Sequence, residues 1–266
     1  MPFGEEVLIT EFVVHLMASM TEHAFKRIRP KFLRLKFARP NDDARIAFAA
    51  ILRVRTDDQK YLLVRNAGRN EAFTPFGGVY KYRHAAAHSL EKLDFRPEVI
   101  RDDMKLDLRG FLPRKHVIKI SDWFVKNVDR ESPTECLSRE LTEELAEAGI
   151  QDPLLRPNRL EFEKLRIVFE GPQEIKSDIS YTQLRIFEVF DIARASDDAR
   201  QFEETLIAHA RRQRSKHRSL LLVSEREIFA GRAGTGEVIG NPAGYLFTQK
   251  RILPEGPRPV PSLTAR

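Results

Sequence analysis

Apolar runs separated by short polar turns mark the middle of the chain and predict a domain that mixes strands and helices. Residues 45–54 are largely apolar, which suits a buried strand. The turn-forming residues 56–59 follow, and residues 60–66 fit a second strand, so the two are expected to form a hairpin. Further strands are predicted over residues 160–169, 181–190 and 220–223.

Two capping boxes predict where helices begin. Ser132-Pro133-Thr134-Glu135 combines an N-cap serine with a glutamate three positions later and has proline at the first helical position. This helix is expected to run to about residue 148, with Gly149 as its stop. The second box starts at Ser224 and predicts a short helix, and a longer helix is expected over residues 197–212.

The chain divides into three parts on this pattern. Residues 1–40 are expected to form a helical or mixed extension, residues 41–245 the main domain, and residues 246–266 a Pro-rich tail that does not pack. In the extension, the apolar stretch 7–20 is too short to span a membrane. We expect it to be an amphipathic helix on the core, with a helix lying on a membrane surface as the alternative.

Composition excludes several classes of protein. Hydrophobic residues make up 42% of the 266 positions, enough to form a core, so a disordered chain is excluded. The single cysteine, Cys136, excludes a disulfide framework and a cysteine-based zinc cluster. A reducing cytoplasm is therefore the expected compartment, and Cys136 is expected to be a packed, inert thiol rather than a nucleophile.

The net charge of +6 is unevenly distributed. Two runs hold twelve basic residues, Lys26, Arg27, Arg29, Lys31, Arg34, Lys36 and Arg39 in the first and Arg211, Arg212, Arg214, Lys216 and Arg218 in the second. Removing these charges leaves −6 on the rest of the protein. Basic runs can bind nucleic acid, but apolar residues alternate with the charges of the first run, so a solvated face is the other interpretation.

Acidic residues gather on one face of the helix predicted from residue 133. At spacings of i, i+3, i+4 and i+7 these are Glu140, Glu143, Glu144 and Glu147. Leucines 137, 141 and 145 lie on another face and can anchor the helix in a core. Close carboxylates repel unless solvent screens them or a cation binds, and Mg²⁺ and Mn²⁺ prefer such oxygen ligands. A solvated face and a metal site both fit this spacing.

The sequence around these acids resembles a known motif. Glu131, seven intervening residues and Arg139-Glu140-Leu141-Thr142-Glu143-Glu144 are similar to the Nudix box, G-x5-E-x7-R-E-U-x-E-E-x-G-U. The resemblance implies a Nudix α/β/α sandwich with a mixed sheet, and a hydrolase that uses Mg²⁺ or Mn²⁺. It also implies that Glu140, Glu143 and Glu144 hold the metal, that Arg139 orients them, and that Glu131 braces the loop entering the helix.

The motif departs from the family pattern in two places. Val125 stands where the box has its first glycine, and the Gly77-Gly78 pair lies far upstream, so the box is split by an insertion over about residues 83–128. The closing glycine comes three residues late, at Gly149. Neither departure removes a carboxylate. The resemblance implies that Gly77 and Gly78 form the loop that precedes the box.

The split pattern resembles one branch of the superfamily. The segments 60–64, 75–81, 107–109, 123–124 and 130–131 are similar to the SMODS-associated Nudix family, over about residues 45–245. That family is linked to bacterial anti-phage operons that signal through cyclic oligonucleotides. Membership would imply a nucleotide-derived ligand. Trp123-Phe124 could stack on a nucleobase, although packing within the insertion is the simpler expectation.

Three functions follow as hypotheses. The first is a metal-dependent hydrolase of a phosphoanhydride in a nucleoside diphosphate-linked or related nucleotide. Glu140, Glu144, Glu174 and Asp178 are all candidates for its general base, and Arg65 and Lys81 could contact phosphates or be surface ion-pair residues. The second is a sensor that binds a nucleotide signal with little turnover. The third is a nucleic-acid-binding protein that uses the basic runs on a Nudix scaffold. The oligomeric state is left open.

Overall fold

The computed structural model describes residues 43–66, 71–99, 102–175, 181–213, 218–249 and 251–252. The predicted extension 1–40, most of the tail, the first basic run, Asp178 and residues 214–217 of the second basic run lie outside these ranges.

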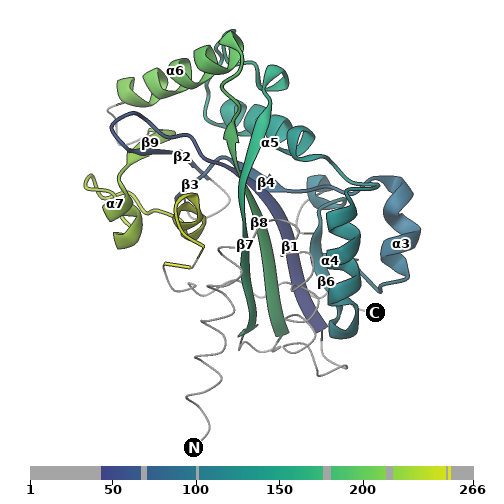
Figure 1. The fold of residues 1–266 in the computed structure, drawn as a ribbon. Coiled ribbons are helices and arrows are strands. Elements are labelled where there is room, and N and C mark those ends of the chain that lie inside the picture. Colours follow the sequence, from purple (N-terminus) through teal and green to yellow (C-terminus); the bar gives the residue numbers. More distant parts are fainter. Residues whose placement is uncertain are drawn as a thin grey trace, which may run out of the picture.

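A six-stranded mixed sheet forms the centre of the fold (Figure 1). Its order is β5-β6-β1-β8-β7. The short strand β4 also pairs with β1, at residues 49–51, whereas β6 pairs with residues 43–47. The central strands β1 and β8 run parallel, whereas the other pairings are antiparallel. The strands are β1 (Asp43–Leu52), β4 (Gly77–Val79), β5 (Arg96–Pro97), β6 (Arg109–Pro113), β7 (Phe162–Ile175) and β8 (Tyr181–Ile192). The predicted mixed sheet is confirmed.

The predicted hairpin between the first two strands is wrong. The second strand, β2 (Tyr61–Arg65), belongs to a separate sheet with β3 (Phe73–Thr74) and β9 (Leu220–Val223). Both edges of β1 are already occupied at its end, because the Leu52 N–H bonds the Phe76 carbonyl and the Arg53 N–H bonds the Phe190 carbonyl. Only the turn retains hairpin pairing, through an isolated bridge between Arg55 and Tyr61.

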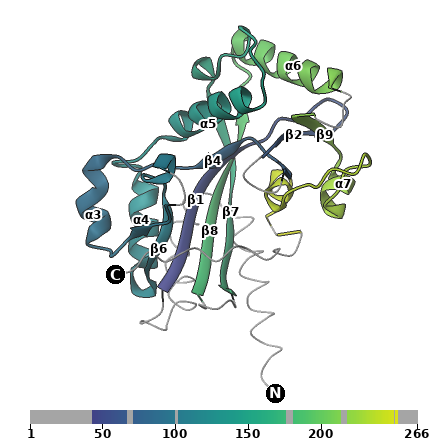
Figure 2. The same ribbon diagram turned by 180° about the vertical axis from the view of Figure 1, so that it is seen from behind.

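Helices cover the sheet and close its ends (Figures 1 and 2). The α-helices are α3 (Ala87–Glu91), α4 (Val117–Lys126), α5 (Pro133–Glu147), α6 (Asp197–Arg212) and α7 (Glu225–Ala230). Short 3₁₀ turns are η2 (His84–Ala86), η3 (Asp102–Met104), η4 (Arg114–His116), η5 (Pro157–Arg159) and η6 (Asn241–Leu246). Both capping boxes form as predicted, at Ser132 and Ser224. Within the described ranges, no helix combines the length and apolar content needed to cross a membrane.

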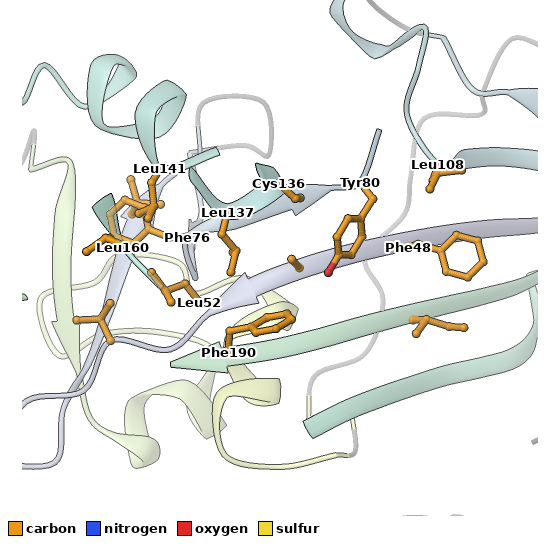
Figure 3. Packing of buried hydrophobic residues seen from close by; sticks show 14 of the residues in the cluster. Phe48, Leu52, Phe76, Tyr80, Leu108, Cys136, Leu137, Leu141, Leu160 and Phe190 are labelled. Atoms are coloured by element: carbon orange, nitrogen blue, oxygen red, sulfur yellow. The ribbon is translucent and has the colours of Figure 1, made fainter. Parts of the chain in front are cut away.

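The main core joins α5 and the insertion to one face of the sheet. Leu137 and Leu141 of α5 are fully buried and point toward β1, β8 and Phe76, as Figure 3 shows. Phe124 of α4, inside the predicted insertion, stacks on Phe48 of β1 with ring centroids 4.2 Å apart. The insertion therefore belongs to the core. Phe124 is buried as expected, but its stacking partner lies on β1 and not within the insertion.

The opposite face of the sheet carries a charged network that holds the C-terminal segment. Glu170 on β7 accepts a hydrogen bond of 2.6 Å from the Tyr245 hydroxyl and is ion-paired with Arg185 and Arg251. Tyr245 is 1% exposed, and burial beside Glu170 raises the pKa of its phenol. Ile252 packs on the second sheet's apolar cluster, so the packed part of the chain continues past residue 245.

Replacing Tyr245 by Phe tests how strongly this network holds the C-terminal segment. The change leaves a buried carboxylate with one hydrogen bond fewer, which should lower the free energy of unfolding by about 2 kcal/mol. Tyr82→Phe is the matched control, because its hydroxyl makes an exposed hydrogen bond to the Lys105 carbonyl. Urea denaturation of both variants measures the difference. Equal stability losses would contradict the importance of the Glu170 network.

Candidate active site

Local chemistry fixes where helix α5 begins. The Ser132 hydroxyl accepts a hydrogen bond from the Glu135 N–H (3.2 Å), and the Glu135 carboxylate accepts one from the Ser132 N–H (2.7 Å). Pro133 stands at the first helical position, where no N–H is required. These contacts set the start of the helix, and the buried leucines set its rotation. The acidic face is therefore directed toward β4.

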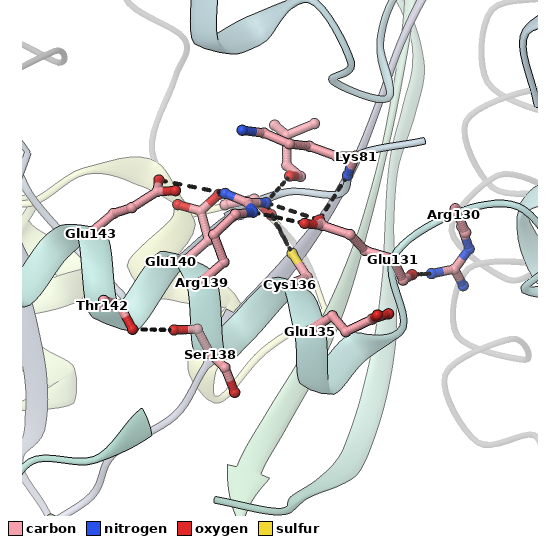
Figure 4. A network of polar contacts seen from close by, with 12 residues as sticks. Lys81, Arg130, Glu131, Glu135, Cys136, Ser138, Arg139, Glu140, Thr142 and Glu143 are labelled. Atoms are coloured by element: carbon pink, nitrogen blue, oxygen red, sulfur yellow. Dashed lines mark hydrogen bonds and ion pairs between the residues drawn. The ribbon is translucent and has the colours of Figure 1, made fainter. Parts of the chain in front are cut away.

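Arg139 is the centre of the acidic face (Figure 4). Its Nε and Nη2 donate to the two carboxylate oxygens of Glu131 at 2.8 and 2.9 Å, and Nη2 also donates to the Val79 carbonyl at 3.0 Å. Its Nη1 donates to Glu140 at 2.7 Å and lies 3.5 Å from Glu143. Burial opposes the charge, but the bonds to Glu131 and the Glu140 charge raise the pKa of Arg139 above its ordinary value. The guanidinium stays charged.

Glu131 links the loop that precedes α5 to the segment that follows β4. Besides holding Arg139, its Oε2 accepts a hydrogen bond from the Lys81 N–H at 2.9 Å, and its own N–H donates to the Lys81 carbonyl. The neighbouring Arg130 is buried and stacks over the rings of Phe124 and Tyr80. Arg130 Nη1 donates to the Glu131 carbonyl at 2.6 Å, so this loop is fixed from two directions.

Gly77 and Gly78 allow α5 to approach the sheet closely. They were expected in a loop, but they form strand β4 and pair with Ile51 and Ala50 of β1. A Cβ atom on Gly78 would lie 2.1 Å from Glu140 Oε1. Gly77 has φ +123°, and its N–H donates to Glu144 Oε2 at 2.9 Å. Each glycine therefore places one carboxylate of the helix.

The three predicted metal ligands differ in environment. Glu144 is buried, the Glu140 side chain is 16% exposed, and the Glu143 side chain is 51% exposed. Burial raises the pKa of Glu140, and the charges of Glu143 and Asp107 raise it further, although Arg139 opposes this. The exposed Glu147 lies on the same helix.

These carboxylates fit a hard divalent cation by chemistry, because their oxygens are the donors that Mg²⁺ and Mn²⁺ prefer. Among the described residues, no three His, Cys, Asp or Glu side chains stand in a cluster that could hold a metal ion. One reason is visible in the geometry. Arg139 Nη1 lies between the carboxylates of Glu140 and Glu143 and supplies the positive charge there.

The other predicted residues are not all brought to this face. Arg65 ends β2 in the second sheet, where it is 3.8 Å from Glu71. The Lys81 backbone contacts Glu131 directly, while Glu174 lies on β7 in the main sheet. Cys136 is buried against the Gly78 carbonyl, and burial raises the pKa of its thiol well above the ordinary value, as expected of an inert, packed cysteine.

Asp107 is an acid that the sequence did not single out as a site residue. Its backbone forms a bridge opposite Lys81, and the side chain is buried and bonded to Arg109 Nη2 at 3.0 Å. Its charge contributes to the raised pKa of Glu140, so the insertion supplies part of the site's electrostatics. The polar-apolar-polar alternation of residues 107–109 is typical of an extended segment. This segment pairs with the residues that follow β4, and Leu108 is fully buried.

Alanine at the two glycines should separate positioning from folding. Gly78→Ala does not require a positive φ, and the atoms nearest to its Cβ belong to the flexible end of the Glu140 side chain, so the fold should survive while Glu140 is displaced. Gly77→Ala places Cβ 2.2 Å from the Ala50 carbonyl at a positive φ, and should cost about 2 kcal/mol or more in stability. Thermal denaturation and Mn²⁺ titration of both variants measure the two effects. A stable Gly77→Ala protein would contradict the tight β4–β1 contact.

Comparison with known families agrees with this geometry. Residues 43–247 match the family described as the SMODS-associated NUDIX domain. Neither a curated protein nor a solved structure matches the chain. The matched span runs from the first residue of β1 past η6 and includes the arginine-centred acidic face of α5. The chain belongs to the SMODS-associated NUDIX domain family.

Proposed function

We propose that this protein is a divalent-metal-dependent hydrolase of a phosphoanhydride bond in a nucleoside diphosphate-linked or related nucleotide. One observation supports this proposal above the others: Glu140 lies against Gly78, and Glu144 accepts a hydrogen bond from the Gly77 N–H. The helix that carries both acids is held in place by the ion pair between Arg139 and Glu131. Such fixed positions favour catalysis, because groups held in place need no reorganisation during the reaction. A Nudix domain supports a nucleotide-related hydrolase or a related module.

The carboxylates Glu140, Glu143 and Glu144 would hold Mg²⁺ or Mn²⁺. When bound, the metal neutralises charge on the phosphoryl oxygens and lowers the pKa of the attacking water. Glu143 is the ligand best able to reorient, because its side chain is half-exposed and its contact with Arg139 is long, at 3.5 Å. Arg139 keeps its two bonds to Glu131 in that case, so the helix stays in register with β4.

The reaction also needs a carboxylate to accept the proton of water. Glu140 fits this role because burial raises its pKa, which makes its carboxylate a stronger base than an exposed one. Glu144, Glu174 and Asp178 remain candidates. We propose Gly77, Gly78 and Lys81 as the substrate-facing backbone beside Glu140. Arg65 would contact a substrate that extends from this face toward the second sheet.

A nucleotide sensor with little turnover is the second candidate. The observation that favours it is the position of Arg139 Nη1, which contacts both Glu140 and Glu143 and already supplies a positive charge to them. A protein that keeps this ion pair would bind a nucleotide without a full set of metal ligands. In either case we propose a role in nucleotide signalling of anti-phage systems, in line with the family to which the chain belongs.

Charge-neutral variants of α5 test the hydrolase directly. With Mg²⁺ or Mn²⁺, we expect turnover of at least one compound in a panel of nucleoside diphosphate derivatives, dinucleoside polyphosphates, capped RNA and cyclic oligonucleotides. Glu143→Gln and Glu144→Gln should lower kcat about 100-fold or more, which corresponds to about 3 kcal/mol of transition-state stabilisation. Glu147→Gln is the matched control, because it removes the same charge from an exposed position on the same helix. Equal losses in the control would contradict specific roles for Glu143 and Glu144.

Direct metal binding distinguishes the two candidates. Calorimetric titration with Mn²⁺ should show a saturable site in the wild-type chain that disappears in the triple variant Glu140→Gln, Glu143→Gln, Glu144→Gln. The expected hydrolase shows both this site and turnover. Saturable nucleotide binding without a metal site, and without turnover of any compound in the panel, would instead identify the sensor.

A further inference from the structure

A second concave surface lies away from the carboxylate face. The turn between β1 and β2, the segment after β8 and one side of α6 line a cavity of about 700 Å³. Figures 1 and 2 show α6 beside this turn in both views. A smaller hollow of about 370 Å³ shares Arg55 and Arg194 with it and continues toward the end of β8. No residue lining either hollow comes from α5 or β4.

Arginine dominates the lining of this cavity. Five arginines contribute, and they are Arg55, Arg194, Arg200, Arg211 and Arg212. The acids that line it are Asp57, Glu203 and Glu204, so the lining carries an excess of two positive charges. Arginine is the side chain best suited to phosphate, because its planar donors bind two oxygens at once.

Internal ion pairs satisfy only part of this charge. Arg194 donates two hydrogen bonds to the carboxylate of Glu203, at 2.6 and 3.3 Å, so both oxygens of that acid have a partner. Arg211 reaches Asp58 only at 3.8 Å. Arg212 makes no direct hydrogen bond within the described ranges, but its charge, after the hydrogen bonds from His209 and the Leu154 N–H, helps to lower the pKa of Asp152. Arg211 and Arg212, in the last turn of α6, therefore make only weak ion contacts, whereas Arg200 is ion-paired with Asp197.

Arg55 contributes a guanidinium whose position is restricted by its surroundings. Its Nε is buried and has no hydrogen-bond partner within the described part of the chain. The guanidinium lies 5.8 Å from the centre of the Tyr61 ring, which restricts its position. The buried Nε is closed to solvent, so an anion in the cavity would be bound by the outer Nη donors of this guanidinium.

The origin of these arginines in separate elements argues against a simple helix-end effect. Basic residues at the C-terminus of a helix are favourable by themselves, which explains Arg211 and Arg212 alone. Arg55 and Arg194 come from different segments and converge on the same space. Ile207 and Ala208 add an apolar wall that a ribose or base can contact.

We propose that this arginine-lined cavity binds a small anion with two or more phosphate groups, such as a nucleotide. Its volume lies within the range of small-molecule sites, roughly 300–1,000 Å³. The exposed acids Asp57 and Glu204 in its lining would repel the continuous phosphate chain of a nucleic acid. A compact ligand can instead place its phosphates among the arginines. The site would act independently of the carboxylates on α5.

Calorimetric titration of the full chain with inorganic tripolyphosphate tests the proposal. EDTA is present throughout, so that divalent metal on α5 does not contribute. The double variant Arg55→Gln, Arg212→Gln should bind at least tenfold more weakly. The matched control, Arg156→Gln, Arg226→Gln, removes two exposed arginines from elsewhere in the fold and should bind within twofold of the wild type.

A third variant predicts the opposite sign. Glu204→Gln removes an acid from the lining and should tighten tripolyphosphate binding, a gain that a misfolded protein cannot produce. Melting temperatures check that the Arg55 variant is folded. Equal weakening in the control pair would overturn the site, because it would assign binding to overall charge. Tripolyphosphate binding unchanged in the Arg55, Arg212 variant, with loss of single-stranded RNA binding, would overturn it in favour of nucleic acid.

Discussion

The two-pronged ion pair between Arg139 and Glu131 is the contact on which the acidic face depends. It joins α5 to the loop that enters it, while a third bond from the same guanidinium reaches the Val79 carbonyl on β4. Loss of either partner would leave a partly buried charge without its counterpart, which is a costly state. This one arginine therefore connects the helix, the strand and the loop and fixes how α5 lies on β4. The positions of Glu140 and Glu144 depend on this placement of the helix.

Local signals predicted the elements well, and long-range pairings were the source of error. Capping chemistry at Ser132 and Ser224 gave both helix starts, since such bonds involve neighbours only three residues apart. The predicted hairpin was wrong because β1 pairs with distant strands, with β8 from Ala44 to Leu52 and with β6 and β4 on the other edge. The sequence indicated an insertion over about residues 83–128 but not where it packs. Its α4 contributes Phe124 to the core, a contact that depends on a distant residue, Phe48.

For the candidate site, the helix that carries the acids could be predicted from the sequence, but the arrangement of its side chains could not. The spacing of Glu140, Glu143 and Glu144 places them on one face, and the structure agrees. The sequence could not show that Arg139 would lie between two of these acids, since rotamers depend on the packed surroundings. Asp107 was missed for the same reason. The basic runs were counted correctly, but only the fold shows Arg211 and Arg212 meeting Arg55 across a cavity.

The bond between Lys81 and Glu131 joins residues 50 positions apart, with the whole insertion between them. Closing such a loop has an entropic cost, and contacts between distant residues slow folding. The acids of α5 would lie on one face of any helix with this sequence, yet their native geometry also requires that the insertion is packed on β1. A chain in which the insertion is not packed would still contain the sequence motif but would lack the bond that holds Glu131 at Lys81. The insertion is therefore part of the support of the acidic face, and a change that unfolds it alone would disturb carboxylates that it never touches.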